Sequence, residues 1–191
     1  IASVQTKGTE ATVEAYTKLL NYAATHPDAT IQYKASDMIL HIHTDASYLS
    51  ATQARSRAGG FHFLSNDPAQ GEPMINGALH VQANIMKNVV SSAAEAEVGA
   101  AFMNAQEACP TRQLLIDMGH PQPATPIQTD NACAEGIING TVKQKRSKAM
   151  DMRFYWLRDR VDQGQFTIHW KRGDTNLADY FTKHHSAAHH R

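Results

Sequence analysis

The chain has 191 residues, of which 42% are hydrophobic, and its 18 basic and 18 acidic side chains give a net charge of zero. This hydrophobic share supports the core of one ordinary domain with an extension, and it excludes a disordered chain. A net charge of zero predicts no general attraction to nucleic acid, so any such binding must come from local clusters of basic residues.

The cysteine content and the ends of the chain indicate its setting. Cys109 and Cys133 are too few for a disulfide framework, and they favour a reduced, intracellular environment. No apolar run approaches the length of a membrane span, and no signal peptide is recognised. The sequence begins at Ile1 without an initiator methionine, which suggests a piece cut from a longer polypeptide, although removal of a leader would look the same.

The first 37 residues are interpreted as a connecting segment with one helix. Thr9 or Thr12 is suited to cap the helix, and the segment His26-Pro27-Asp28 is expected to end it. Apolar residues recur at helical spacing, and their face is expected to pack on the following domain or on a neighbouring one. This face consists of Val13, Tyr16, Leu19, Leu20 and Ala23.

A domain of residues 38–185 is expected to follow, with a histidine-rich tail at 186–191. Alternating apolar and polar residues predict three strands joined by short connections, which favours an antiparallel meander. Helical spacing then predicts a long helix that pauses at Pro110 and resumes to Gly119. The three strands are placed at 38–45, 56–64 and 77–84, and the helix begins near residue 91.

The second half of the domain alternates strands with helices. Strands are predicted at 127–130 and 166–170, and helices at 132–138, 149–162 and 175–183. Crossovers through helices favour parallel neighbours. The expected fold is therefore α/β, with a five-stranded mixed sheet that is antiparallel in its first three strands, then parallel, and flanked by helices. In the helix at 149–162, the residues expected to point inward are Met152, Tyr155, Trp156 and Val161.

Four acidic residues occupy comparable positions in these elements. Asp45 ends the first predicted strand and Asp130 the fourth, whereas Glu97 and Asp179 lie in the first turns of helices. Four carboxylates gathered at one edge of a sheet would repel one another unless cations lay among them. Oxygen ligands in this number favour Mg²⁺ or Mn²⁺, and a pair of such ions can cleave phosphodiester bonds.

The motifs around these acids resemble those of a known family. The matching segments are Thr44-Asp45-Ala46-Ser47, Ser91-Ser92-Ala93-Ala94-Glu95-Ala96-Glu97, Thr129-Asp130-Asn131 and Leu177-Ala178-Asp179-Tyr180-Phe181-Thr182-Lys183. In this order they resemble the ribonuclease H domain of Ty1/copia-like LTR retrotransposon polyproteins. The resemblance covers about residues 38–185, and the segment before it resembles the connection from reverse transcriptase.

The resemblance implies a function and a ribonuclease H-like fold. Asp45, Glu97, Asp130 and Asp179 would be the catalytic residues and the ligands of two Mg²⁺ ions, which Mn²⁺ would be able to replace. The enzyme would cleave the RNA strand of RNA–DNA hybrids during reverse transcription and leave 3′-hydroxyl and 5′-phosphate ends. Its partner would be the reverse transcriptase domain of the same polyprotein, in the cytoplasm and in virus-like particles, with no role for a membrane.

Two details of the motifs leave alternatives open. Glu95 lies two residues before Glu97, so in a helix the two side chains cannot face the same ions. The position of the motif before Val98 favours Glu97. The loop at 171–176 lacks the histidine that many ribonucleases H carry there, and His169 is interpreted as a packed or surface residue of the strand.

Basic and polar residues near the motifs are candidates for binding the hybrid. The basic residues suit phosphate contacts, and Asn131 or Ser47 could hydrogen-bond a 2′-hydroxyl group. Trp156 and Trp170 are expected in the core, and the histidines of the tail in solvent. The full set of candidates is Ser47, Arg55, Arg57, Asn131, Lys143, Lys145, Arg146, Lys148 and Arg153.

Two other functions remain possible on this fold. One is a catalytically weak or inactive module that binds hybrid and supports the polymerase. The other is a different nuclease, such as an integrase-like or resolvase-like enzyme, whose acids are usually fewer or differently spaced.

Overall fold

The computed structural model describes residues 6–142 and 151–185, and the chain divides into two units at residues 32 and 33. The first unit holds helix α1 (Glu10–Thr25). Thr9 caps it in a reciprocal arrangement: its hydroxyl accepts from the Thr12 N–H, and Thr12 accepts from the Thr9 N–H. No residue of α1 is buried, so the packing of its apolar face stays a prediction.

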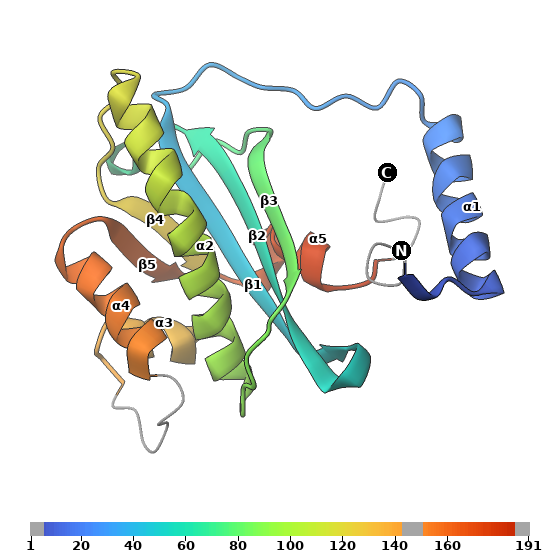
Figure 1. Cartoon of the computed structure of the whole chain (residues 1–191). Coiled ribbons are helices and arrows are strands. Elements are labelled where there is room, and N and C mark those ends of the chain that lie inside the picture. Colours follow the sequence, from blue (N-terminus) through green and yellow to red (C-terminus); the bar gives the residue numbers. More distant parts are fainter. Residues whose placement is uncertain (1–5, 143–150, 186–191) are drawn as a thin grey trace. The chain divides into compact units, whose positions relative to one another are not determined.

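The second unit is built on one five-stranded mixed sheet, as predicted (Figure 1). Its order is β3-β2-β1-β4-β5, in which β1 pairs antiparallel with β2 and parallel with β4. β2 and β3 are antiparallel, and β4 and β5 are parallel. The strands are β1 (Ile39–Ala51), β2 (Arg55–Ser65), β3 (Ala78–Ile85), β4 (Thr125–Thr129) and β5 (Phe166–Trp170).

The hydrophobic core lies between one face of this sheet and three helices. The helices are α2 (Ala93–Asp117), α3 (Ala132–Ile138) and α4 (Asp151–Asp162), and α2 runs along the central strands (Figure 1). Branched and aromatic side chains of the sheet pack against them because alternate strand residues point to the same face. The largest buried side chains of this cluster are Leu40, Ile42, Ile127, Ile138, Leu157 and Phe166.

The short helix α5 (Asp179–Thr182) covers the opposite face. Two consecutive glycines of β2 show this arrangement. A Cβ on Gly60 would overlap the side chain of Asn104 in α2, whereas a Cβ on Gly59 would lie 2.6 Å from Thr182 Cγ2. Neighbouring strand residues point to opposite faces, so the two glycines let α2 and α5 approach the sheet from its two sides.

Helix α2 differs from the prediction because it continues through Pro110. Proline removes one backbone hydrogen bond of a helix and is costly in its interior. Here Ala108 and Leu115 are buried on either side of it, and Arg112 donates to the Pro123 carbonyl at 2.7 Å. Tertiary packing therefore holds the helix together past the proline.

Two other predicted details were wrong. In α4 the buried residues are Phe154 and Leu157, whereas Met152 is 87% exposed and Tyr155 is 60% exposed. Trp156 and Val161 do pack against the core, as expected. Trp170, expected in the core, is exposed at the end of β5.

The last helix is also shorter than the predicted span of 175–183. The buried Asn176 donates to the Thr44 carbonyl at 2.8 Å and accepts from the Ala178 N–H at 3.1 Å. Such bonds between a side chain and nearby backbone compete with helix formation. In the part of the chain that the structure describes, no helix is long and apolar enough to cross a membrane.

Candidate metal centre

The register of the sheet brings Asp45 and Asp130 together. Ile42 and His43 of β1 pair with Ile127 and Gln128 of β4 in parallel register. Continuing this register by two residues places Asp45 level with Asp130, immediately after β4 ends. Asp45 is 1% exposed, so its carboxyl group lies inside the protein.

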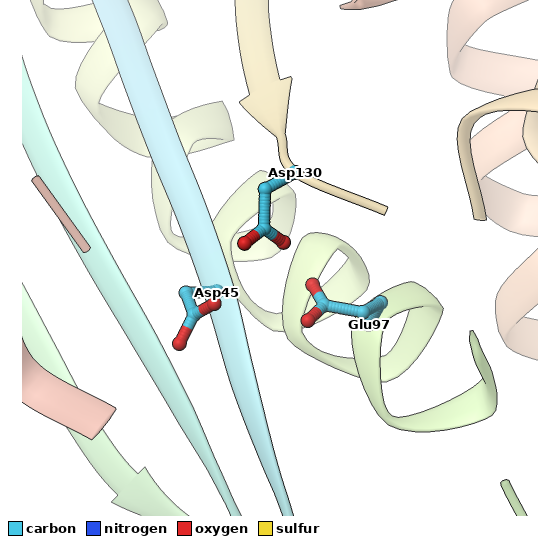
Figure 2. A group of neighbouring side chains, drawn as sticks. All are labelled: Asp45, Glu97 and Asp130. Carbon is cyan, nitrogen blue, oxygen red and sulfur yellow. The ribbon is translucent and has the colours of Figure 1, made fainter. Parts of the chain in front are cut away.

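Helix α2 supplies the third acid. Glu97 is buried in the second turn of α2 and points at the two aspartates (Figure 2). One carboxylate oxygen from each of Asp45, Glu97 and Asp130 lies within 4.8 Å of the other two. These three residues form what we call the acid trio.

Hydrogen bonds hold Glu97 in this orientation and give Glu95 a different role. Glu97 accepts from the Ala46 N–H at 3.1 Å and from the Thr129 hydroxyl at 3.4 Å. Glu95 accepts from the N–H and hydroxyl of Ser91 at 2.6 and 2.7 Å, so it stabilises the start of α2. The arrangement favours Glu97 over Glu95 as a metal ligand.

The fourth acid, Asp179, lies beside the acid trio rather than within it. It begins α5 and forms an ion pair with Lys183 at the end of that helix. The Lys183 ammonium also lies 3.9 Å from Asp45 Oδ1, and the Thr182 hydroxyl donates to Asp45 Oδ2. Helix α5 is therefore anchored on Asp45 through two side chains.

The electrostatics of the acid trio disfavour three negative charges. Burial, followed by the charges of Asp45 and Asp130, raises the pKa of Glu97 to about 9. Burial also raises the pKa of Asp45 to about 6, although the Thr182 hydroxyl and Lys183 oppose this shift. The pKa of Asp130 is raised by burial as well. Each carboxyl group of the trio therefore holds its proton to a higher pH than an ordinary carboxyl group does.

This donor set fits a hard divalent cation. Its ligand atoms are carboxylate oxygens, which Mg²⁺ and Mn²⁺ prefer, and their close approach is favourable only around positive charge. The sequence alone led to the same expectation, and the buried, mutually repelling carboxyl groups support it.

A buried polar network fixes α2 on the sheet behind the acid trio. The Asn104 amide donates to Thr44 Oγ1 at 3.1 Å and to the Gly59 carbonyl at 2.9 Å, and His62 Nε2 donates to Asn104 Oδ1 at 2.8 Å. Burial lowers the pKa of His62 to about 4, so the ring is neutral near pH 7. Because Asn104 lies two turns after Glu97 on α2, this network sets the position of Glu97 relative to β1.

Two of the predicted substrate residues lie on the same face of the sheet as Asp45. Ser47 follows Asp45 by two residues in β1 and pairs with Arg57 of β2. Both side chains therefore project from the face that carries Asp45. Arg55 is exposed at the start of β2, and its guanidinium reaches the Met86 and Lys87 carbonyls at 3.5 Å.

The other candidates for binding substrate do not share the face of the sheet that carries Asp45, or they lie outside the described residues. Asn131 caps α3 by accepting from the Ala134 N–H at 3.0 Å, which occupies its side-chain oxygen. Arg153 is half-buried on α4. The remaining basic candidates, Lys143, Lys145, Arg146 and Lys148, lie outside the described residues.

The turn after β5 reaches the acid trio without a histidine. A Cβ on Gly173 would lie 2.8 Å from Asp130 Oδ2, so glycine allows this turn to pass close to the acid. The Trp170 indole N–H donates to the Asp130 carbonyl at 2.9 Å. His169 is half-buried within β5, as the sequence suggested.

Sequence reasoning missed three residues that organise the site: Thr182, Lys183 and Asn104. The first two lie in the Asp179 motif, and their spacing of three and four residues from Asp179 placed them on its side of a helix. Asn104 gave a weaker signal, an amide seven residues after Glu97 in an otherwise alanine-rich stretch.

Comparisons with known proteins agree with the fold and the motifs. No protein-family model matches the chain. It is 26% identical over 170 residues to the retrovirus-related Pol polyprotein from transposon TNT 1-94 of Nicotiana tabacum, a match that covers 89% of this chain and 12% of the polyprotein.

Among solved structures, the chain is similar to LC11-RNase H1, isolated from compost by a metagenomic approach. The TM-score is 0.56, with 14% identity over 75% of this chain and 92% of that one. A structure of LC11-RNase H1 in complex with RNA/DNA hybrid gives a TM-score of 0.52, with 15% identity over 74% and 92% of the two chains. The N-terminal RNase H domain of Rv2228c from Mycobacterium tuberculosis gives 0.50, with 13% identity over 76% and 91%. The chain thus has the ribonuclease H fold and resembles a retrotransposon polyprotein in sequence, as its motifs indicated.

Proposed function

We propose that this chain is a metal-dependent ribonuclease H, which cleaves the RNA strand of RNA–DNA hybrids during reverse transcription of a retrotransposon. The observation that carries the proposal is the acid trio: three carboxyl groups from β1, α2 and the end of β4 within 4.8 Å of one another. A module that only binds nucleic acid has no use for buried carboxylates beside phosphates, because like charges repel.

The proposal assigns a role to each group at the site. Asp45, Glu97 and Asp130 would hold a divalent cation, with Asp179 completing the set beside Asp45. Two Mg²⁺ ions bound there, or Mn²⁺ in their place, would supply an activated water and charge stabilisation at the leaving oxygen. The hydrogen bonds from Ala46 and Thr129 keep Glu97 oriented for this task.

Substrate binding would use the face of the sheet that carries Asp45. Ser47 lies two residues after Asp45 in β1, and Arg57 lies opposite Ser47 in β2. From these positions Arg57 would contact a phosphate and Ser47 a ribose hydroxyl of the bound hybrid. Arg55 and Asn131 would extend this contact near the strand ends, and Arg153 of α4 and the basic residues between 143 and 148 would supply phosphate contacts from another part of the domain. The exposed Trp170 adds an aromatic surface next to Asp130.

The matched polyprotein supports a wider context for the proposal. This chain spans 12% of that relative, so we propose that the ribonuclease H domain (38–185) works beside a reverse transcriptase domain of the same polyprotein. Residues 1–37 would form the connection, and 186–191 a tail. The site of action would be intracellular, in cytoplasmic virus-like particles.

The proposal is tested with a labelled RNA–DNA hybrid incubated in Mg²⁺ or Mn²⁺. The wild-type chain is expected to cut the RNA strand and leave double-stranded DNA intact. Asp130→Asn should lose cleavage by about a hundredfold or more, because it removes one charge of the acid trio. Asp117→Asn is the matched control, since this exposed acid at the end of α2 lies outside the acid trio and accepts from Gln113 Nε2 at 2.8 Å.

Two outcomes would overturn the proposal. Tight binding of hybrid without cleavage in either metal would indicate a non-catalytic module, with the missing loop histidine as the first explanation to examine. Cleavage of double-stranded DNA in preference to the hybrid would indicate another nuclease on the same fold.

A further inference from the structure

The site carries a cation of its own, Lys183. This residue lies four positions after Asp179, so both side chains share one side of α5 and form an ion pair. The same ammonium lies 3.9 Å from Asp45 Oδ1. Lys183 thus contacts one member of the acid trio and the one proposed ligand outside the trio.

Asp45 therefore belongs to two groups of charges. On one side it faces Glu97 and Asp130, and no basic side chain forms an ion pair with either of these acids among the described residues. On the other side it faces Lys183 and Asp179, where one ammonium is shared by two carboxylates. The two sides are unlike: Glu97 and Asp130 have no ion-pair partner among the described residues, whereas the space between Asp45 and Asp179 already holds an ammonium.

The pKa of Lys183 reflects this shared position. Burial lowers the pKa of its ammonium, but the hydrogen bond to Asp179 and the charges of Asp45, Asp179 and Asp130 outweigh burial and raise it. The ammonium is therefore charged near pH 7. Its side chain is 47% exposed, so it can leave the site without disturbing the core.

We propose that Lys183 occupies the cation position between Asp45 and Asp179 in the metal-free chain. A first divalent ion then binds at the acid trio, and a second ion binds only when it displaces the ammonium. This inference rests on the proposed metal-binding function and adds an order of binding to it. Once displaced, the ammonium stays on a flexible four-carbon stem near Asp179, where it can pair with a substrate phosphate.

The test measures Mn²⁺ binding to the whole chain in the absence of substrate. Calorimetry and electron paramagnetic resonance give the number of bound ions and their affinities. The wild-type chain should show one tighter and one weaker ion. Lys183→Met should strengthen the weaker ion about fivefold, the size expected when a partly exposed ion pair no longer competes, and leave the tighter ion little changed. Lys183→Arg keeps the positive charge and should keep the second ion weak.

The chain offers a matched control in another helix. Glu14 and Lys18 of α1 form an ion pair at the same spacing of four residues, with N and O 2.8 Å apart, and both are exposed. Lys18→Met should leave both Mn²⁺ affinities unchanged. Circular dichroism of each variant checks that it is folded.

Unchanged affinity for the second ion in a folded Lys183→Met variant would overturn the inference, as would an equal gain in Lys18→Met. The proposed function has a separate test, because it would be refuted if the wild-type chain did not cleave hybrid. The measurement of Mn²⁺ binding does not depend on cleavage.

Discussion

Replacing Glu97 by glutamine is expected to stabilise the metal-free chain at pH 8 while abolishing ion binding at the acid trio. The pKa of Glu97 is raised from its ordinary value of 4.5 to about 9, chiefly by burial. At pH 8 the folded chain therefore holds a proton that the unfolded chain has lost. Taking up this proton opposes folding, and glutamine removes that cost because its amide is neutral at every pH.

The magnitude follows from the interval between the ordinary pKa and the working pH. Each pKa unit corresponds to about 1.4 kcal/mol, so the roughly 3.5 units between 4.5 and pH 8 set an upper figure of about 5 kcal/mol. Glutamine can still accept from the Ala46 N–H and can donate to the Thr129 hydroxyl, so both hydrogen bonds survive. We expect a gain of about 2–5 kcal/mol in the free energy of unfolding.

The dependence on pH has a defined sign. A raised pKa in the folded state means that the carboxyl group contributes stability fully below about pH 4.5, and that this contribution is lost as the pH rises toward about 9. The advantage of the Glu97→Gln variant should therefore shrink to less than about 1 kcal/mol at pH 5. Asp45, whose pKa is raised to about 6, adds a loss of stability in the same direction at the lower end of this range.

Urea denaturation in the presence of EDTA at pH 5 and pH 8 measures the free energy of unfolding of the wild-type chain and of Glu97→Gln. In the presence of Mn²⁺ the wild-type chain should become the more stable of the two. Mn²⁺ should stabilise the wild-type chain and have little effect on Glu97→Gln. Glu95→Gln is the control: it weakens the bonds to Ser91 at the start of α2 and should lower stability slightly at both pH values. A Glu97→Gln variant that is less stable than wild type at pH 8 in EDTA would refute the reasoning.

Three further changes probe the supports of the site. Asn104→Leu should lower the free energy of unfolding by about 2–4 kcal/mol in urea denaturation, because it leaves His62 and neighbouring polar groups buried without their partner. Gly59→Ala should cost about 1–3 kcal/mol and weaken Mn²⁺ binding in calorimetry, since the new Cβ would lie 2.6 Å from Thr182 Cγ2. Thr182→Val should raise the pKa of Asp45 further, because the hydroxyl that lowers it is lost; carboxyl ¹³C NMR titration of the metal-free chain measures this shift.

The sheet was predictable because its signals are local. Alternation along residues 38–45 and 56–64 is typical of strands, and short connections favour antiparallel pairing of the first strands, although residues 39–45 are buried on both faces of the sheet. The prediction for Asp130 follows from the same logic, since this acid comes directly after β4. The prediction that Asp45 ends its strand was wrong, because β1 continues to Ala51 and Asp45 is buried within it. The two carboxyl groups come close to each other because β1 and β4 pair in parallel, as the structure shows.

The failures concern features that depend on tertiary contacts. A proline normally interrupts a helix, and the sequence around Pro110 does not indicate that Ala108 and Leu115 are buried on either side of it. In α4 every position from 154 to 157 is apolar or aromatic, so the pattern does not specify which side chains point inward. The spacing of four residues put Lys183 beside Asp179, but nothing local linked it to Asp45, which is 138 positions earlier in the sequence.

Helix α5 is the part of the site with the least stability of its own. It has four residues, and it is held on β1 by contacts from Asn176, Leu177 and Thr182 to Thr44, His43 and Asp45. A segment attached by a few bonds can open while the core remains folded. Opening here would withdraw Asp179 and Lys183 together and leave the acid trio in place. On heating, α5 should therefore open before the sheet unfolds, and the proposed cleavage of hybrid should fade at temperatures where the sheet is still intact.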